Sequence, residues 1–85
     1  MPRRPLSNER SRARALLGRC LAVARERARL TQDVVASRLE VRRPTIGAWE
    51  AGGAEPLAVD LLRLADLYGV TLDQLAGRAP LPPPE

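Results

Sequence analysis

Arginine supplies the chemistry that stands out in this 85-residue sequence, because all 14 of its basic residues are arginines. A guanidinium group is always charged and presents a planar fork of donors that fits phosphate. Residues 1–43 hold twelve arginines against four acids, a net charge of +8, whereas residues 44–85 carry a net charge of −4. A basic half on so small a chain points to a polyanion as partner, and nucleic acid is the usual one. The alternative is an arginine-rich surface that meets only solvent.

Other chemistries lack the side chains that they need. There is no histidine, and the single cysteine, Cys20, excludes an internal disulfide and a cysteine-rich metal site. Because Cys20 lies among leucine and alanine, we expect it to be a buried apolar residue. Paired acids on one face, a glycine-rich phosphate loop and metal-ligand spacing are all missing from the sequence. We therefore expect no enzyme activity, no cofactor and no bound metal.

The sequence also lacks signals for membranes and secretion. No stretch approaches the ~18 consecutive apolar residues of a membrane span. The first arginines are not followed by the apolar region of a secretory signal. We expect a cytoplasmic protein without a membrane partner.

The elements that position the arginines are expected to be helices. Leucine and alanine are abundant, the only aromatic residues are Trp49 and Tyr68, and no run alternates with the period of a strand. The predicted fold class is all-α, a compact globule of five helices. We expect a flexible basic arm over residues 1–7, a domain over residues 8–78, and a proline-rich tail or linker over residues 79–85.

Capping and stop residues set the expected helix bounds. The first helix is expected from Asn8 or Ser11 to Ala28. The second starts after Thr31, a good N-cap, and ends near Leu39. A turn over residues 40–42 leads to a third helix, with Pro44 in its first position and Arg43 in the capping position, which ends before Gly52. A fourth is expected from Pro56 to Gly69, and a short fifth between Thr71 and Gly77.

Residues 32–50 carry the most informative pattern. Two short helices joined by a tight turn pack at a steep angle, which requires a small residue at their crossing and apolar residues around the turn. Ala36 is the small residue at that crossing. The apolar positions are Val35, Leu39, Val41, Ile46 and Trp49.

From Leu17 to Leu75 the chain resembles the Cro/cI-type helix-turn-helix family of bacterial and phage repressors, also called the XRE family. The resemblance rests on Gln32 opening the second helix, on the small and apolar residues just named, and on two later motifs. These are Trp-Glu-x-Gly at residues 49–52 and Leu-Tyr-Gly-Val-Thr-Leu-Asp-Gln-Leu at residues 67–75. It implies a lambda-repressor-like fold whose third helix enters the major groove of double-stranded DNA.

The resemblance also implies roles for individual residues. A structural ion pair is expected between Arg25 and Glu50. The residues expected to face the bases are Arg43, which can bind guanine O6 and N7 with two hydrogen bonds, and Pro44, Thr45, Gly47 and Ala48. The residues expected to contact phosphate are Gln32, Arg38 and Arg42, with Arg3 and Arg4 on the arm. For the two arm residues, a solvated and disordered arm is the alternative.

The sequence departs from the family pattern in three ways. Glu40 stands where the family prefers glycine, at a turn residue that often has a positive φ, so either this residue is strained or the turn differs. Arg42 and Arg43 replace the usual serine cap of the third helix, so a shift of its first turn by one residue is an alternative. The loop after that helix carries Glu55 in place of basic residues, and phosphate would repel it. These departures affect the expected base contacts more than the fold.

The sequence therefore predicts a DNA-binding transcription regulator, a repressor, that binds DNA as a homodimer. We expect the dimer contact at Val70 and Leu72, near a fifth helix too short to hide every apolar side chain. The alternative is an antitoxin-like or adaptor protein whose main role is to bind a protein partner. The acidic second half and the proline-rich tail are compatible with that alternative.

Overall fold

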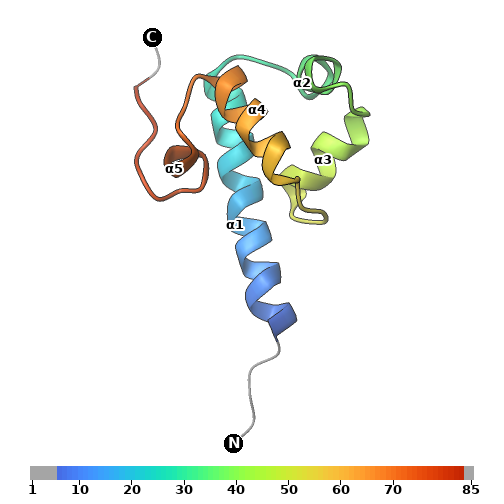
Figure 1. Ribbon diagram of the computed structural model, residues 1–85, viewed down its shortest axis with the longest axis vertical. Coiled ribbons are helices and arrows are strands. Elements are labelled where there is room, and N and C mark those ends of the chain that lie inside the picture. The colour runs from blue at the N-terminus through green and yellow to red at the C-terminus, as the bar shows by residue number, and fades with distance from the viewer. Residues whose placement is uncertain (1–5, 84–85) are drawn as a thin grey trace, which may run out of the picture.

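Five α-helices organise residues 6–83, which are the residues that the computed structural model describes, and no strand occurs within them (Figure 1). The long α1 packs against α3, α4 and α5, and α2 packs against α3. The predicted all-α fold with five helices is confirmed. The helices are α1 (Leu6–Arg27), α2 (Gln32–Leu39), α3 (Arg43–Ala51), α4 (Ala58–Tyr68) and α5 (Leu72–Leu75).

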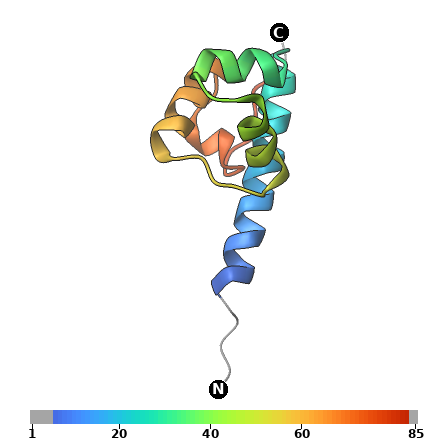
Figure 2. The same ribbon diagram turned by 90° about the vertical axis from the view of Figure 1, so that its right-hand side faces the viewer.

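The N-terminal part of α1 projects beyond the other helices in both views (Figures 1 and 2). The helix begins at Leu6 rather than at Asn8 or Ser11, so the last residues of the expected arm are helical. Its C-terminal half is the part that enters the core, through Leu21 and Ala24. No helix of residues 6–83 combines the length and the hydropathy needed to cross a bilayer.

The core draws on all five helices. Val35, Leu39, Ile46 and Trp49, four of the apolar residues of the segment 32–50, are buried, and Val41 packs against them from the turn. Ala36 is 4% exposed, as its predicted place at the helix crossing requires. The other buried residues are Leu21, Ala24, Leu64, Ala65, Tyr68 and Leu75.

The helix starts follow local capping in two cases and depart from expectation in two others. Thr31 and Thr71 accept hydrogen bonds from backbone N–H groups at the starts of α2 and α5. Arg42 is the N-cap of α3, but its side chain makes no capping bond; Arg43 is already helical, and Pro44 follows it. The prediction that Pro44 opens this helix and Arg43 caps it was therefore wrong by one residue. Likewise α4 begins at Ala58 and not at Pro56.

The tail lies against the domain as far as residue 83. Arg27 donates from Nε to Pro82 O at 2.6 Å and from Nη2 to Pro83 O at 3.1 Å. Gln74 donates to Pro80 O at 2.9 Å, and Leu81 packs against the core. A proline-rich tail or linker was expected over residues 79–85. Within its described part, the side chains of Arg27 and Gln74 donate to proline carbonyl groups, which lack a neighbouring proline N–H as donor.

Tyr68, the only tyrosine, gives the core a measurable pH response. Its side chain is 4% exposed, and burial raises the pKa of its hydroxyl well above the ordinary value of 10.0. The folded state therefore holds this proton more tightly than the unfolded state. The stabilisation is present below pH 10 and is lost as the pH rises toward the pKa of the folded state.

We expect the free energy of unfolding to fall by about 1.4 kcal/mol per pH unit above pH 10 through Tyr68. Denaturant unfolding at several pH values measures the slope, and the ultraviolet spectrum of the single tyrosine follows its ionisation. Tyr68→Phe removes the titrating group and keeps the ring, so the slope should disappear in that variant. An equal slope in both proteins would assign it to other groups.

Candidate nucleic-acid interface

The turn between α2 and α3 is held by the backbone and by a side chain of α4. Glu40 ends α2 in the left-handed conformation, with φ 58°, and its N–H and that of Val41 bond back to Ser37 O and Ala36 O. This confirms the positive φ expected at residue 40, which is strained for a residue other than glycine. Arg63 donates to Leu39 O at 3.1 Å and to Arg38 O at 3.2 Å, so a cation covers the negative end of α2.

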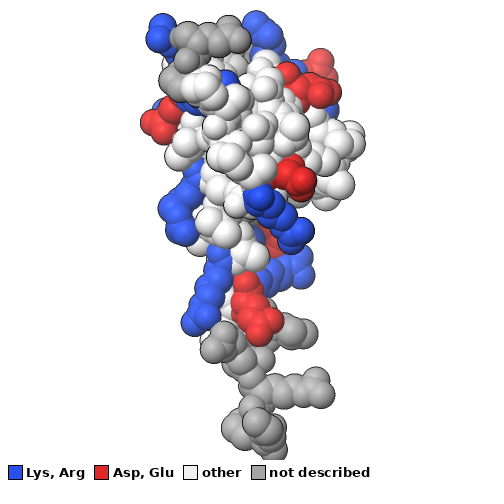
Figure 3. All heavy atoms as spheres, turned by 90° about the vertical axis from the view of Figure 1, so that its left-hand side faces the viewer, with Lys and Arg blue, Asp and Glu red and all other residues white. Residues whose placement is uncertain are grey.

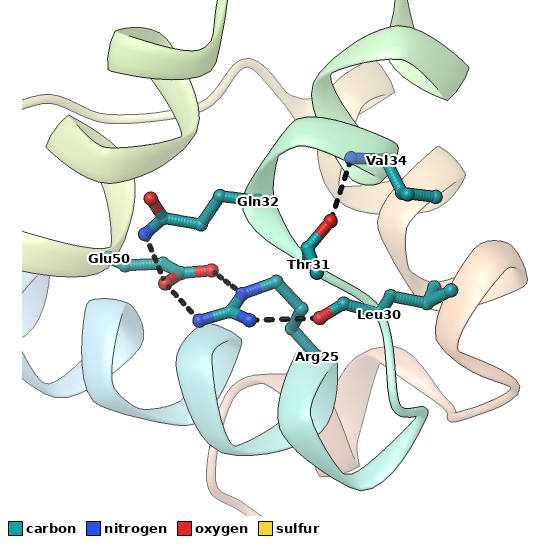
Figure 4. A network of polar contacts seen from close by, with 6 residues as sticks. All are labelled: Arg25, Leu30, Thr31, Gln32, Val34 and Glu50. Carbon is teal, nitrogen blue, oxygen red and sulfur yellow. Dashed lines mark hydrogen bonds and ion pairs between the residues drawn. The ribbon is translucent and has the colours of Figure 1, made fainter.

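A network of polar contacts fixes α3 against α1 (Figure 4). Arg25 holds Glu50 with both sides of its fork, at 2.7 Å from Nε and 3.0 Å from Nη2. Its Nη1 donates to Leu30 O at 2.9 Å, which ties in the loop before α2. The hydrogen bond with Glu50 raises the pKa of Arg25, and the side chains of the two residues are only 15% and 8% exposed. The structure thus forms the ion pair that the resemblance implied.

Gln32 belongs to the same network. Its amide nitrogen donates to Glu50 Oε1 at 2.9 Å, so one of its two amide hydrogens points into the protein. The other hydrogen remains for the expected phosphate contact, which stays a prediction. Of the other residues expected at phosphate, Arg38 and Arg42 are exposed. Arg3 and Arg4 lie outside the described residues.

The residues expected to face the bases lie on the side of α3 that the core leaves uncovered. Arg43 and Pro44 are exposed, whereas Ile46 and Trp49 of the same helix are buried. The other three, Thr45, Gly47 and Ala48, are half-buried. The helix α3 packs against α2 and lies on the part of the molecule turned toward the viewer in Figure 2. A helix face whose donor and small side chains are exposed or half-buried suits insertion into the major groove.

Glu55 is tied to α1 and does not stand free in its loop. Arg10 binds its carboxylate with two contacts, at 2.5 and 2.9 Å, and Arg14 Nη1 lies 3.6 Å away. The hydrogen bond from Arg10 lowers the pKa of Glu55, which stays ionised. Glu55 was expected to repel phosphate, but two arginines of the projecting part of α1 pair with its charge. Other basic side chains also lie along this part of α1 (Figure 3).

The comparison with protein families decides the assignment. A family model described as a helix-turn-helix domain matches residues 16–77, more than half of the chain. The chain is a helix-turn-helix domain. The match is consistent with the Cro/cI resemblance, and it spans α2, the turn, α3 and the helices that hold them. No curated protein and no solved structure gives a significant match.

Helix-turn-helix domains bind DNA through the second helix of the motif, which here is α3. Three features of this helix-turn-helix domain escaped the sequence analysis: the Arg63 cap on α2, the Arg10–Glu55 pair, and an ion pair between Asp33 and Arg43. The first two join residues 24 or more positions apart, so no local pattern shows them. Asp33 lies in the first turn of α2, and its neighbour in space follows from the packing of α2 against α3.

Proposed function

We propose that this helix-turn-helix domain is a sequence-specific regulator of transcription, a repressor acting in the cytoplasm, that reads double-stranded DNA with α3 in the major groove. The observation that carries the proposal is the division of α3 into two sides. One side buries Ile46 and Trp49 and is locked by Glu50 to Arg25. The other side offers Arg43 and small residues to a ligand.

The chemistry of that outward side supports base reading. The fork of Arg43 matches the two acceptors of guanine in the major groove, and Thr45 offers a hydroxyl and a methyl group to a neighbouring base. Gly47 and Ala48 have almost no side chain, so the backbone of α3 can approach the bases closely. Gln32, Arg38 and Arg42 would then contact phosphates on either side of the groove.

Selection of duplexes from a randomised library tests the proposal, followed by titration of the best duplex at several salt concentrations. Because each phosphate contact releases counterions, the logarithm of the binding constant should fall linearly with the logarithm of the salt concentration. Arg38→Ala and Arg42→Ala should each reduce that slope by about 1 and weaken all duplexes evenly. A binding constant that does not change with salt would contradict the proposal.

A homodimer on DNA is part of this proposal. Specific affinity among many competing sites usually requires two recognition helices. Leu72 is 46% exposed at the start of α5, whereas Val70 is half-buried and packs against the core. Leu72 is therefore the better probe of a two-fold contact in this region, because its substitution leaves the core intact.

Leu72→Asp should leave the domain folded and weaken binding to a duplex with two half-sites by about tenfold or more, since two like charges would face each other across the axis. Val59→Asp is the matched control, because Val59 is also an exposed apolar residue near a helix start, on α4. Sedimentation of the complex checks the stoichiometry. One chain per duplex at saturating protein would contradict the dimer.

One observation favours a protein partner as a second function. Leu57, Val59 and Leu62, on and before α4, are 70%, 56% and 51% exposed, and exposed apolar side chains that form a patch mark protein interaction sites. An antitoxin-like or adaptor role would use this surface. A partner that binds the parent at fixed stoichiometry and is lost on Leu62→Ser, with DNA binding retained, would support that role.

A further inference from the structure

Asp33 and Arg43 meet where the first turn of α2 lies beside the first turn of α3. Asp33 Oδ1 is 3.4 Å from Arg43 Nε, and the side chains are 76% and 63% exposed. Four residues further along α3, a Cβ added to Gly47 would lie 3.8 Å from Gln32 Oε1. The first two residues of α2 thus lie along one edge of α3, and that edge contains Arg43, the arginine proposed to read a base.

Asp33 places a negative charge on the surface that is proposed to approach DNA. A carboxylate on a surface that approaches phosphate lowers affinity for every DNA sequence. An ion pair as exposed as this one adds little to the stability of the fold. The remaining effect of Asp33 is on how the Arg43 side chain contacts DNA.

We propose that Asp33 is a positioning residue for base recognition, which holds Arg43 at Nε so that the two terminal nitrogens of the guanidinium are presented to guanine. This inference rests on the proposed function and names the residue pair that sets its specificity. A free arginine samples many rotamers and must be ordered on binding. Asp33 restricts that freedom beforehand, and its contact at Nε leaves the two terminal nitrogens, Nη1 and Nη2, available for O6 and N7.

The test measures discrimination at one base pair. The best duplex from the randomised library is compared with its single base-pair variants, for the parent and for three substitutions. Arg43→Ala should lose about 5- to 150-fold discrimination at the base pair it reads. Asp33→Asn should lose about two- to tenfold at that same base pair, while its affinity for unrelated duplexes rises because one repelling charge is gone. Asp33→Glu keeps the carboxylate and should retain part of the discrimination.

Asp73→Asn is the matched control, because Asp73 occupies the same place in α5, two residues after a threonine cap, as Asp33 does in α2. It removes the same charge and should leave discrimination at every base pair unchanged. In the Arg43→Ala background, Asp33→Asn should also have no effect on discrimination.

Two results would overturn the inference alone: Asp33→Asn shifting all duplexes by one common factor, or Arg43→Ala retaining the discrimination of the parent. A parent that enriches no duplex and binds none with salt dependence would overturn the proposed function together with this inference. Thermal unfolding of each variant accompanies the titrations, so that a loss of fold is recognised as such. If Asp33→Asn does not fold, Asp33→Glu still tests the inference. A change in affinity of equal size for every base-pair variant would contradict a positioning role for Asp33.

Discussion

Glu50→Ala is expected to lower the free energy of unfolding by about 3 kcal/mol, near the lower end of the range for a broken buried ion pair. The substitution leaves Arg25 with its charge but without the carboxylate that it holds at 2.7 and 3.0 Å, and it also removes the acceptor of Gln32. The lower end applies because the side chain of Arg25 is still 15% exposed and recovers some hydration. Chemical denaturation with a two-state fit measures the change.

Two further variants isolate the cause. Arg25→Met combined with Glu50→Leu replaces both charges with apolar groups and should recover much of the loss. Glu55→Ala breaks a bidentate pair of the same kind, with Arg10, at the exposed end of α1 and should destabilise the domain far less. Additive effects of the changes at residues 25 and 50 would show that the pair contributes no coupling.

Gly18→Ala is expected to destabilise the domain by about 2–3 kcal/mol, although alanine is the better helix former. Gly18 is where α1 crosses the C-terminal end of α3. A methyl group there would lie 2.4 Å from Glu50 O and 2.7 Å from Trp49 O, so the two helices must move apart. Because these atoms belong to the backbone, no rotation of a side chain relieves the clash. Thermal and denaturant unfolding measure the loss.

Gly47→Ala is the control for that substitution. Gly47 also lies inside a helix, but a methyl group there meets only the flexible end of Gln32, at 3.8 Å. The gain in helix propensity should then appear, and the domain should become more stable by about 0.5–1 kcal/mol. Destabilisation of equal size at both positions would show that crowding at Gly18 is not the cause.

The structure could be predicted from the sequence where residue type and local spacing determine it. The apolar positions around the turn, the small Ala36 and the threonine caps follow from residue type and spacing, and the helices α2 and α3 end where Leu39 and Gly52 predict. Arg25 and Glu50 were paired through a family pattern rather than through physics. The start of α3 was misplaced by one residue because Arg42 makes no capping bond that would mark it.

The rest depends on contacts between residues distant in the chain. The sequence shows Glu55 only as an acid in a loop, because its partner Arg10 lies 45 positions away in the chain. The sequence shows the tail only as a run of prolines, whereas in the structure Arg27 donates hydrogen bonds to two of its carbonyl oxygens. Gly18 is one small residue among alanines and leucines, and its importance appears only once the carbonyl groups of α3 lie above it. Such contacts become visible only when the helices are placed in space.

Arg63 connects α4 to the C-terminal end of α2. It bonds the last carbonyl groups of α2 from a position on α4 next to Leu62, which is exposed. A ligand that covers this part of α4 and changes how well Arg63 holds α2 would alter DNA affinity by some factor. Thermodynamic reciprocity then requires DNA to alter the affinity for that ligand by the same factor. Such a ligand would act through the hydrogen bonds of Arg63 to Leu39 O and Arg38 O.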